Sequence, residues 1–379
     1  TINGSLKLTN DGNYIPPDGR STFTVLHSDQ PPSSESSRFK ISIMPGRADG
    51  KFYKLVYGDQ GRGGYTIEIV TEYLPVDGSL SSPDEIGVSV QATDVLVADL
   101  FGPEGGGLDG FDDIALTIDG SPGSLYLFVN DGNGGISLQT TYPTGNGPTA
   151  LTAGDMNDDG IQDIIVTNGL DDTVQYWINP DADATTLTPQ APIPTGSMPY
   201  DLIAFDIDSD TDDDIVVTCA GNGLPDQATG LYYGVVQFFQ SDGSRNRALT
   251  PKQEIVVNNQ PRGISPGEID NPGDKQDDII VSLGTGNQVV RLGNPGDDSN
   301  WTIEQTIDVG SRPNSIEPLP IGGSIGTVFL VANEGSDSLS VLGADDNGDL
   351  GVIASIDVEA TPIGMTTVDM DGDSDRDLA

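Results

Sequence analysis

Short runs of apolar residues, many of them β-branched, alternate with polar turns along the chain. Typical runs are Ile-Ile-Val at 164–166, Ile-Val-Val at 215–217 and Ile-Ile-Val at 279–281. Glycine and proline, 49 and 26 residues respectively, punctuate the segments between such runs. No stretch has the 3.6-residue apolar period of a long amphipathic helix. The pattern predicts an all-β protein of many short strands joined by turns.

A repeat becomes visible when the prolines are aligned, because several of them stand seven positions before an acid. The pairs are Pro148 with Asp155, Pro199 with Asp206, Pro362 with Asp369 and Pro261 with Glu268, and Pro313 keeps the same register ahead of Pro320. In most copies an acidic loop and then an apolar strand follow. Two copies upstream begin at residues 38 and 92. The seven starts lie 49 to 62 residues apart, which is the size of one four-stranded propeller blade.

The two chain ends together supply one more part of the repeat. Residues 362–379 and 1–37 add up to 55 residues, and Ala379 followed by Thr1 resembles the continuous stretch 113–121. The sequence therefore predicts one all-β domain over 1–379, a seven-bladed β-propeller whose last blade is closed by the N- and C-terminal segments. Its units are 38–91, 92–147, 148–198, 199–260, 261–312, 313–361, and 362–379 plus 1–37.

Three loops between the first and second strands of a unit carry oxygen side chains at positions 1, 3, 5 and 9, with a backbone carbonyl available at position 7. The residues are Asp155, Asn157, Asp159, Ile161 and Asp163; Asp206, Asp208, Asp210, Asp212 and Asp214; and Asp369, Asp371, Asp373, Asp375 and Asp377. Calcium takes six to eight oxygen ligands, and carboxylates this close repel one another without a cation. The loops are predicted to bind Ca²⁺. An EF-hand is excluded, because position 12 is Val166, Val217 or absent where a bidentate glutamate should stand, and a strand follows where a helix is needed.

Two further loops are irregular versions of this pattern. One contains an insertion and carries Glu268, Asp270, Asp274 and Asp278; the other is expanded and carries Asp99, Asp109 and Asp113. Counting both, the chain has three to five candidate calcium sites. The corresponding loop before Val328 has lost its acids, and Asp49 stands almost alone in the first unit, so no metal is expected in either.

The motif Asp-x-Asn/Asp-x-Asp, followed by Asp-Ile or Asp-Leu at the head of a strand, resembles the FG-GAP or VCBS repeat propellers, which include the integrin α-subunit head. The resemblance covers essentially the whole chain. It implies a β-propeller with calcium loops bracing one side of the ring, away from the usual ligand face. The family includes adhesion receptors, lectins and non-catalytic parts of secreted enzymes. The chain lacks clear Phe-Gly and Gly-Ala-Pro signatures of the integrin pattern.

Charge narrows the choice of partners. The chain has 59 acids, 16 bases and a formal charge of −43, a field that repels nucleic acid and anionic membranes. No apolar run is long enough for membrane insertion, and the start at Thr1 fits a mature or trimmed secreted chain. Cys219 is the single cysteine, so no intrachain disulfide can form, and it is expected to be a buried apolar side chain. An extracellular or cell-surface location is expected.

Catalytic chemistry has little support in the sequence. His27 is the single histidine, and no Ser-His-Asp or Cys-His arrangement accompanies it. We therefore expect a non-enzymatic extracellular adhesion, binding or scaffold module with a protein or glycan ligand. A lectin-like carbohydrate binder, a secreted polysaccharide hydrolase or lyase, and a filament subunit that self-associates through its terminal strands remain alternatives. The insertion at 221–227 is the expected ligand-contact region.

Overall fold

The computed structural model describes residues 5–7, 24–26, 51–59, 65–73 and most of the chain from residue 91 onward. The gaps after residue 91 are 103–107, 132–134, 208–212, 222–232, 242–248, 268, 270–277, 294–299, 321–326, 346–347, 359–360, 366, 369–376 and 379. Side chains are described between residues 91 and 365, outside these gaps and Pro320.

Five antiparallel sheets form the described body, and in each the strands pair in chain order. Their strands are β5 (Ala92–Ala98), β6 (Asp113–Ile118), β7 (Ser124–Asn130) and β8 (Ile136–Pro143); β9 (Pro148–Gly154), β10 (Asp163–Asn168), β11 (Thr173–Ile178), β12 (Thr188–Pro189) and β13 (Ile193–Pro194); β14 (Pro199–Phe205), β15 (Asp214–Cys219), β16 (Val235–Gln240) and β17 (Thr250–Val256); β18 (Pro261–Gly267), β19 (Asp278–Leu283), β20 (Gln288–Gly293) and β21 (Thr302–Asp308); and β22 (Pro313–Pro320), β23 (Thr327–Asn333), β24 (Ser338–Ala344) and β25 (Leu350–Asp357). In the second sheet β12 and β13 both pair with β11 and share the place of a fourth strand.

Three smaller sheets have two strands each. They are β1 (Ser5–Lys7) with β2 (Thr24–Leu26), β3 (Lys51–Asp59) with β4 (Tyr65–Tyr73), and β26 (Thr367–Val368) with β27 (Asp377–Leu378). Strand β26 contacts β22. Among the described strands, none of the N-terminal pair β1–β2 pairs with β26 or β27, so closure of the last blade by both chain ends stays a prediction.

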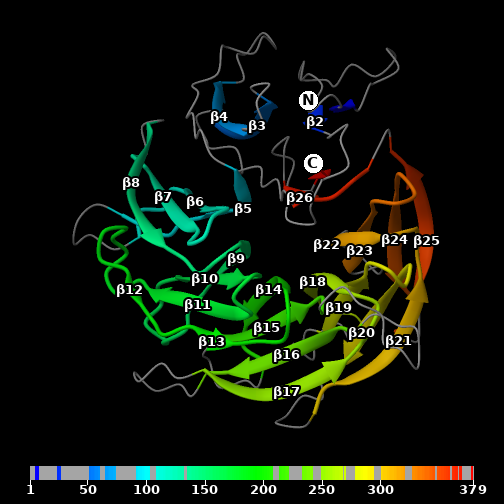
Figure 1. Ribbon diagram of the computed structural model, residues 1–379. Helices are drawn as coiled ribbons and strands as arrows, with labels where there is room; N and C mark the ends of the chain where they lie inside the picture. Colours follow the sequence, from blue (N-terminus) through cyan, green and yellow to red (C-terminus); the bar gives the residue numbers. More distant parts are fainter. Residues whose placement is uncertain are drawn as a thin grey trace.

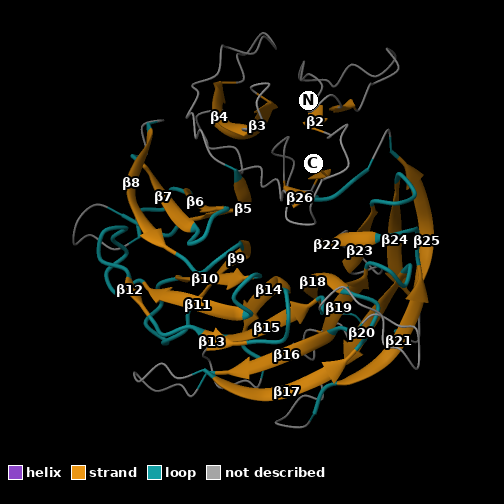
Figure 2. Ribbon diagram, in the orientation of Figure 1, coloured by secondary structure: helices purple, strands orange, loops and turns teal. Residues whose placement is uncertain are grey.

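The five larger sheets follow one another around a central axis (Figure 1). Strands β5, β9, β14, β18 and β22 lie innermost, and each contacts the next. Figure 2 shows strands and loops and no helix in the described part of the chain. The all-β class and the propeller arrangement of four-stranded sheets are thereby confirmed, whereas the count of seven blades stays a prediction.

Apolar layers between neighbouring sheets form the core. The second strands β6, β10, β15 and β19 are buried at every position, because both of their faces pack on other sheets. One layer joins Phe238 of the third sheet to Trp301 of the fourth, with ring centroids 5.2 Å apart. Cys219 is buried, as the sequence predicts. The apolar runs found in the sequence are therefore mostly these central strands.

A repeated hydrogen bond fixes where each sheet begins. The turn between the second and third strands ends at an Asp or Asn whose backbone has a positive φ, the left-handed conformation. The side-chain Oδ1 of this residue accepts the backbone N–H of the residue that precedes the proline at the start of the next unit. The pairs are Met198 N with Asp172 Oδ1 (2.8 Å), Arg312 N with Asn287 Oδ1 (3.1 Å) and Thr361 N with Asp337 Oδ1 (2.8 Å). Asn and Asp tolerate this backbone conformation better than other side chains. These bonds hold the loops at the end of the ring opposite the acidic loops.

Candidate functional site

The acidic loop between β9 and β10 wraps around the carboxylate of Asp155. Its Oδ1 accepts the N–H groups of Asn157 (3.3 Å) and Asp159 (3.1 Å), and its Oδ2 accepts that of Gly160 (2.7 Å). Gly160 has φ +82°, the left-handed conformation that glycine adopts without strain. Each carboxylate oxygen has two lone pairs, so Oδ1 is fully used by its two bonds, whereas Oδ2 keeps one lone pair for a cation.

Asn157 is a buried residue of this loop whose side-chain polar atoms have no partner. The residue is 9% exposed, and neither its Oδ1 nor its Nδ2 has a hydrogen-bond partner. Leaving a buried polar group unpaired costs about 1–3 kcal/mol, so such a group indicates a missing ligand or water. An amide oxygen at position 3 of an acidic loop is a ligand that calcium accepts. The donor set of this loop therefore fits calcium.

Asp163 ties the same loop to the sheet. The side chain is fully buried; Oδ1 accepts the N–H of Asn179 at 2.7 Å and Oδ2 that of Met156 at 3.1 Å. Burial raises the pKa of the Asp163 carboxyl to about 7, and the nearby charges of Asp159 and Asp155 act in the same direction. A bound cation would favour the charged form and oppose this shift.

Two other strand-heading acids repeat this arrangement. Asp113 accepts the N–H groups of Leu100 (3.1 Å), Phe101 (2.8 Å) and Asn130 (2.9 Å), and its pKa is raised to about 7 by burial. Asp214 accepts those of Ile207 (3.2 Å) and Ser241 (2.6 Å). The acid at position 9 thus joins its loop to the sheet in three units, a role that the sequence pattern did not reveal.

Asp278, the corresponding acid of the fourth sheet, is paired differently. Its Oδ2 lies 2.7 Å from Nη2 of the buried Arg291 and also accepts the Nε–H at 3.0 Å. Nη1 of Arg291 donates to the carbonyl of Gly348 in the next sheet at 2.9 Å, and Glu304 lies 3.4 Å from Nη2. This carboxylate therefore has a cationic partner within the protein.

The remaining predicted ligands are described only in part. Asp99 Oδ2 accepts the N–H of Gly110 at 3.0 Å and its Oδ1 is buried without a partner; Asp109 Oδ1 accepts the N–H of Phe111. Burial raises the pKa of Asp99. Other predicted ligands lie outside the described residues: Asp208, Asp210, Asp212, Glu268, Asp270, Asp274, Asp369, Asp371, Asp373 and Asp375. Of Asp377 only the backbone, in β27, is described.

Within the part of the chain that the structure describes, no three His, Cys, Asp or Glu side chains gather closely enough to hold a metal ion. The oxygens of Asp155, Asp159 and Asp163 are instead turned toward backbone N–H groups. The calcium sites stay a prediction. The chemistry of the donor set and the unpaired Asn157 amide support them.

Asp213 connects two neighbouring loops and was missed in the sequence. Its Oδ2 accepts the N–H of Asp155 at 2.7 Å, and its own N–H donates to the Asp155 carbonyl at 3.1 Å. Burial raises the pKa of Asp213, as do the charges of Asp155 and Asp206. The residue before the strand-heading acid is the position that could have indicated this contact. The first acid of one loop is thus attached to the next loop.

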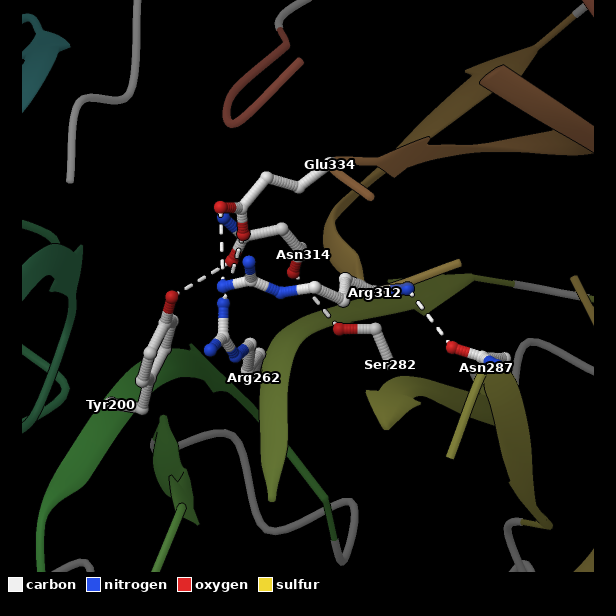
Figure 3. Close-up of polar contacts among 7 residues, drawn as sticks. All are labelled: Tyr200, Arg262, Ser282, Asn287, Arg312, Asn314 and Glu334. Atoms are coloured by element: carbon white, nitrogen blue, oxygen red, sulfur yellow. Dashed lines mark hydrogen bonds and ion pairs between the residues drawn. The ribbon is translucent and has the colours of Figure 1, made fainter. Parts of the chain in front are cut away.

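A second polar cluster lies where the inner strands β14, β18 and β22 begin, at the end opposite the acidic loops, and Figure 3 shows its side chains. Both oxygens of Glu334 are engaged: Oε2 lies 3.3 Å from Arg262 Nη1, and Oε1 lies 3.2 Å from Arg312 Nη2. Arg262 also lies over the ring of Tyr200, 5.3 Å from its centroid. The Tyr200 hydroxyl donates to Asn314 Oδ1 at 2.8 Å. We name Tyr200, Arg262, Arg312, Asn314 and Glu334 the channel-mouth cluster.

A cavity of about 50 Å³ lies between the inner strands, and we call this space the channel; Tyr200 and Asn314 of the cluster are among the residues that line it. Residues of all five inner strands line it, among them Asp94, Thr149, Asp201 and Asn314. Asp94 Oδ2 accepts the N–H of Leu151 in the next sheet at 2.8 Å, and Asp201 Oδ2 that of Ile264 at 3.3 Å. These acids therefore link neighbouring sheets. The cavity has room for only one or a few waters.

Comparison with known proteins supports the repeat and the fold. A family model described as FG-GAP-like repeat matches residues 108–166 and 155–217. No protein with a curated description matches the chain. No helix among the described residues is long and apolar enough to cross a membrane.

Several solved structures are similar over most of their length. A putative 6-phosphogluconolactonase from Bacteroides uniformis has a TM-score of 0.59 at 13% identity, covering 96% of each chain. A periplasmic gluconolactonase from Pseudomonas aeruginosa has a TM-score of 0.58 at 16% identity, covering 96% of this chain and 92% of that one. A protein from Lactobacillus plantarum has a TM-score of 0.57 at 13% identity, covering 91% and 90%. At these identities the likeness concerns the fold alone. The chain contains FG-GAP-like repeats and has the fold of a β-propeller.

Proposed function

We propose that the protein is an extracellular, calcium-stabilised β-propeller that serves as an adhesion, binding or scaffold module. The buried Asn157 amide, unpaired within a loop of carboxylates, is the observation that carries the calcium part. In this proposal Asp155, Asn157, Asp159, Asp163 and the carbonyl of Ile161 hold one ion. Oxygen-bearing side chains recur at positions 1, 3, 5 and 9 of the loops that begin at Asp206 and Asp369, with Asp at position 3 in place of Asn.

Calcium would have a structural task in these loops. It would satisfy the Asn157 oxygen and neutralise carboxylates that burial otherwise disfavours. Extracellular calcium modules have dissociation constants of about 10⁻⁴ to 10⁻³ M, so sites of modest affinity would fill outside the cell. The binding surface itself would lie elsewhere on the ring, and a protein or glycan is the proposed ligand class.

Thermal unfolding with excess calcium and with chelator tests the proposal. At a calcium concentration 100 times the dissociation constant, each site adds about 2.7 kcal/mol to the free energy of unfolding. Isothermal titration would count the sites, with magnesium as the comparison ion. An unchanged midpoint and no heat of binding would contradict calcium stabilisation.

The variant Asn157→Ala assigns the effect to this loop. Without calcium its stability should equal or exceed that of the natural chain, because the unpaired buried amide is removed. With calcium, Asn157→Ala should gain less free energy of unfolding than the natural chain, by the contribution of one calcium site. The exposed Asn300→Ala serves as the control and should respond to calcium like the unmodified protein. Equal calcium responses in both variants would exclude Asn157 as a ligand.

A non-enzymatic role is part of the proposal. It rests on the single histidine, His27, and on the assignment of the acidic loops to metal. Two structures of similar fold are described as a gluconolactonase and a putative 6-phosphogluconolactonase, so lactone hydrolysis is the first activity to assay. Turnover that disappears in Arg262→Gln, with folding retained, would contradict this part.

A further inference from the structure

We propose that the channel-mouth cluster binds a small organic carboxylate, with the guanidinium of Arg312 as the principal contact. The structure describes the side chains of only four lysines and arginines, and two of them, Arg262 and Arg312, converge on Glu334. Arg262, Arg312 and Glu334 together carry one net positive charge, in a chain whose formal charge is −43, and Asp94 and Asp201 line the adjacent cavity. A local positive charge of this kind attracts an anion that the rest of the surface repels.

The cluster consists of departures from the repeat. At the second position of the inner strand, two sheets carry Thr93 and Thr149, whereas the next three carry Tyr200, Arg262 and Asn314. Repeat packing alone does not require such large polar side chains. The three residues that differ from the repeat lie in one cluster, and this indicates a surface with a specific role on an otherwise regular fold.

Arg312 and Glu334, the other two members of the channel-mouth cluster, also differ from the residues at the same positions of other units. The residue before the unit proline is Gly147, Met198 or Gln260 in other units and Arg312 here. The first residue of the turn after the second strand is Gly169 or Gly284 in two other sheets and Glu334 here. Glu334 and Arg312 are also joined by a backbone hydrogen bond of 3.0 Å.

The arrangement holds the two arginines in different ways. Arg262 is buried over Tyr200 and fits against Gly284, where a Cβ atom would lie 2.5 Å from its Nε. Arg312 has a side chain that is 52% exposed, and its backbone N–H is held by Asn287. Among the described residues, Nη2 is the one guanidinium nitrogen of Arg312 with a protein partner. The remaining N–H donors form a fork that suits a carboxylate.

The cluster and the acidic loops lie at opposite ends of the inner strands. Pro148 and Gly154 mark the two ends of β9, and seven residues in a strand extend over about 20 Å. Carboxylate binding should therefore persist after calcium has been removed, when the acidic loops have no metal. Carboxylate binding can therefore fail while calcium stabilisation holds, or the reverse, so the two proposals are tested independently.

The experiment uses sodium acetate and sodium glucuronate as probes and glucose as the neutral comparison. Calcium is first removed with chelator, and the chelator, itself a polycarboxylate, is then removed by dialysis. Binding of each probe to the full chain is followed by titration calorimetry or by NMR line broadening of the probe. We expect saturable binding of at least one carboxylate and none of glucose. Glucuronate alone would identify an acidic sugar as the ligand, and equal binding of both would identify the carboxylate group itself.

Arg312→Gln should weaken this binding about tenfold or more, and Arg312→Lys should weaken it less, because lysine keeps the charge but loses the fork. Lys252→Gln removes one exposed positive charge from the outer strand β17 and should leave binding unchanged. Absence of saturable carboxylate binding, equal binding of glucose, or equal loss in Lys252→Gln would overturn the proposal.

The variant Glu334→Gln tests the site through a gain of carboxylate affinity, whereas Arg312→Gln tests it through a loss. The internal carboxylate competes with the ligand for both guanidinium groups, so its removal should strengthen carboxylate binding about threefold or more. It also leaves the buried Arg262 without its anion, and acetate should raise the melting midpoint of this variant more than that of the unmodified chain. An acetate effect of equal size in both proteins would count against the site.

Discussion

Arg291 and Asp278 form a buried ion pair of 2.7 Å at a position where the other sheets carry an apolar side chain. Arg291 lies opposite Ile280, as Tyr176 lies opposite Ile165 and Phe238 opposite Val216. In the fourth sheet, a guanidinium from the third strand thus reaches the acid that begins the second strand. In three other sheets the corresponding acids, Asp113, Asp163 and Asp214, are buried and accept backbone N–H groups instead.

Replacing Arg291 by leucine should destabilise the protein by about 3–5 kcal/mol, because Asp278 would remain buried without a partner. The double variant with Asp278→Asn should recover a large part of this loss. Urea unfolding followed by circular dichroism measures both. Lys252→Leu, on an exposed strand, is the control and should change the free energy of unfolding by less than about 0.5 kcal/mol. Equal effects at 291 and 252 would show that the pair contributes nothing.

The contact between Asp213 and Asp155 predicts coupling between two loops. Asp213→Ala removes the acceptor of the Asp155 N–H and should lower stability by about 1–2 kcal/mol. Calcium binding to the two adjacent loops should also become less cooperative, as measured by titration calorimetry. Gln162→Ala changes the corresponding residue of the preceding unit and serves as the control. Unchanged stability and binding in Asp213→Ala would exclude the coupling.

The sequence was informative wherever the repeat imposes the same residue on every copy. The prolines at 148, 199, 261 and 313 begin inner strands, and the acids at 163, 214 and 278 begin the second strands. The backbone conformation at proline and the burial of an apolar strand depend on residues that are close in the sequence. The composition and spacing of the sequence therefore predict both. The fold class could therefore be derived without coordinates.

The residues that the sequence did not reveal act over long separations. Arg262 pairs with Glu334, 72 positions away, and Arg291 looks like an ordinary apolar position until its partner is known. The strand-heading Asp163 was expected to be a ligand, and the structure adds that it binds the N–H of Asn179. Such pairs depend on which strands become neighbours in the ring.

Cys219 provides a prediction on pH and reactivity. Its thiol is buried, and burial raises the pKa from 9.0 to about 12. The unfolded thiol ionises near 9.0 while the folded one stays neutral, so the free energy of unfolding should fall as pH rises from 9.0 toward 12, by up to about 1.4 kcal/mol per pH unit. Below pH 9.0 the thiol is neutral in both states, so it does not change the free energy of unfolding with pH.

Comparison of the natural chain with Cys219→Ala by chemical unfolding at about pH 8 and about pH 10 isolates this contribution, since the alanine variant lacks it. Iodoacetamide should label Cys219 only in denaturant. Rapid labelling of the folded protein at about pH 8 would mean that the thiol is accessible after all.

The two chain ends give the last prediction. Among the described strands, β26 and β27 pair only with each other, and β26 contacts β22. Four of the five larger sheets have four strands and the other has five. A pair of short strands leaves an edge with unpaired backbone groups, which favours the addition of further strands. Residues 1–37 include β1 and β2 and are the segment that the repeat length assigns to this place.

Deletion of residues 1–37 should therefore lower the melting midpoint, and the separate 1–37 peptide should restore it. Closure within one molecule costs no association entropy and predicts a native mass of one chain, 39.6 kDa. Insertion of the segment into the next subunit is a head-to-tail exchange, which propagates as a filament and predicts a mass that grows with concentration. Native mass spectrometry of the full chain separates the two arrangements. An unchanged midpoint after deletion would refute both, because a segment that completes the sheet cannot be removed without exposing its edge.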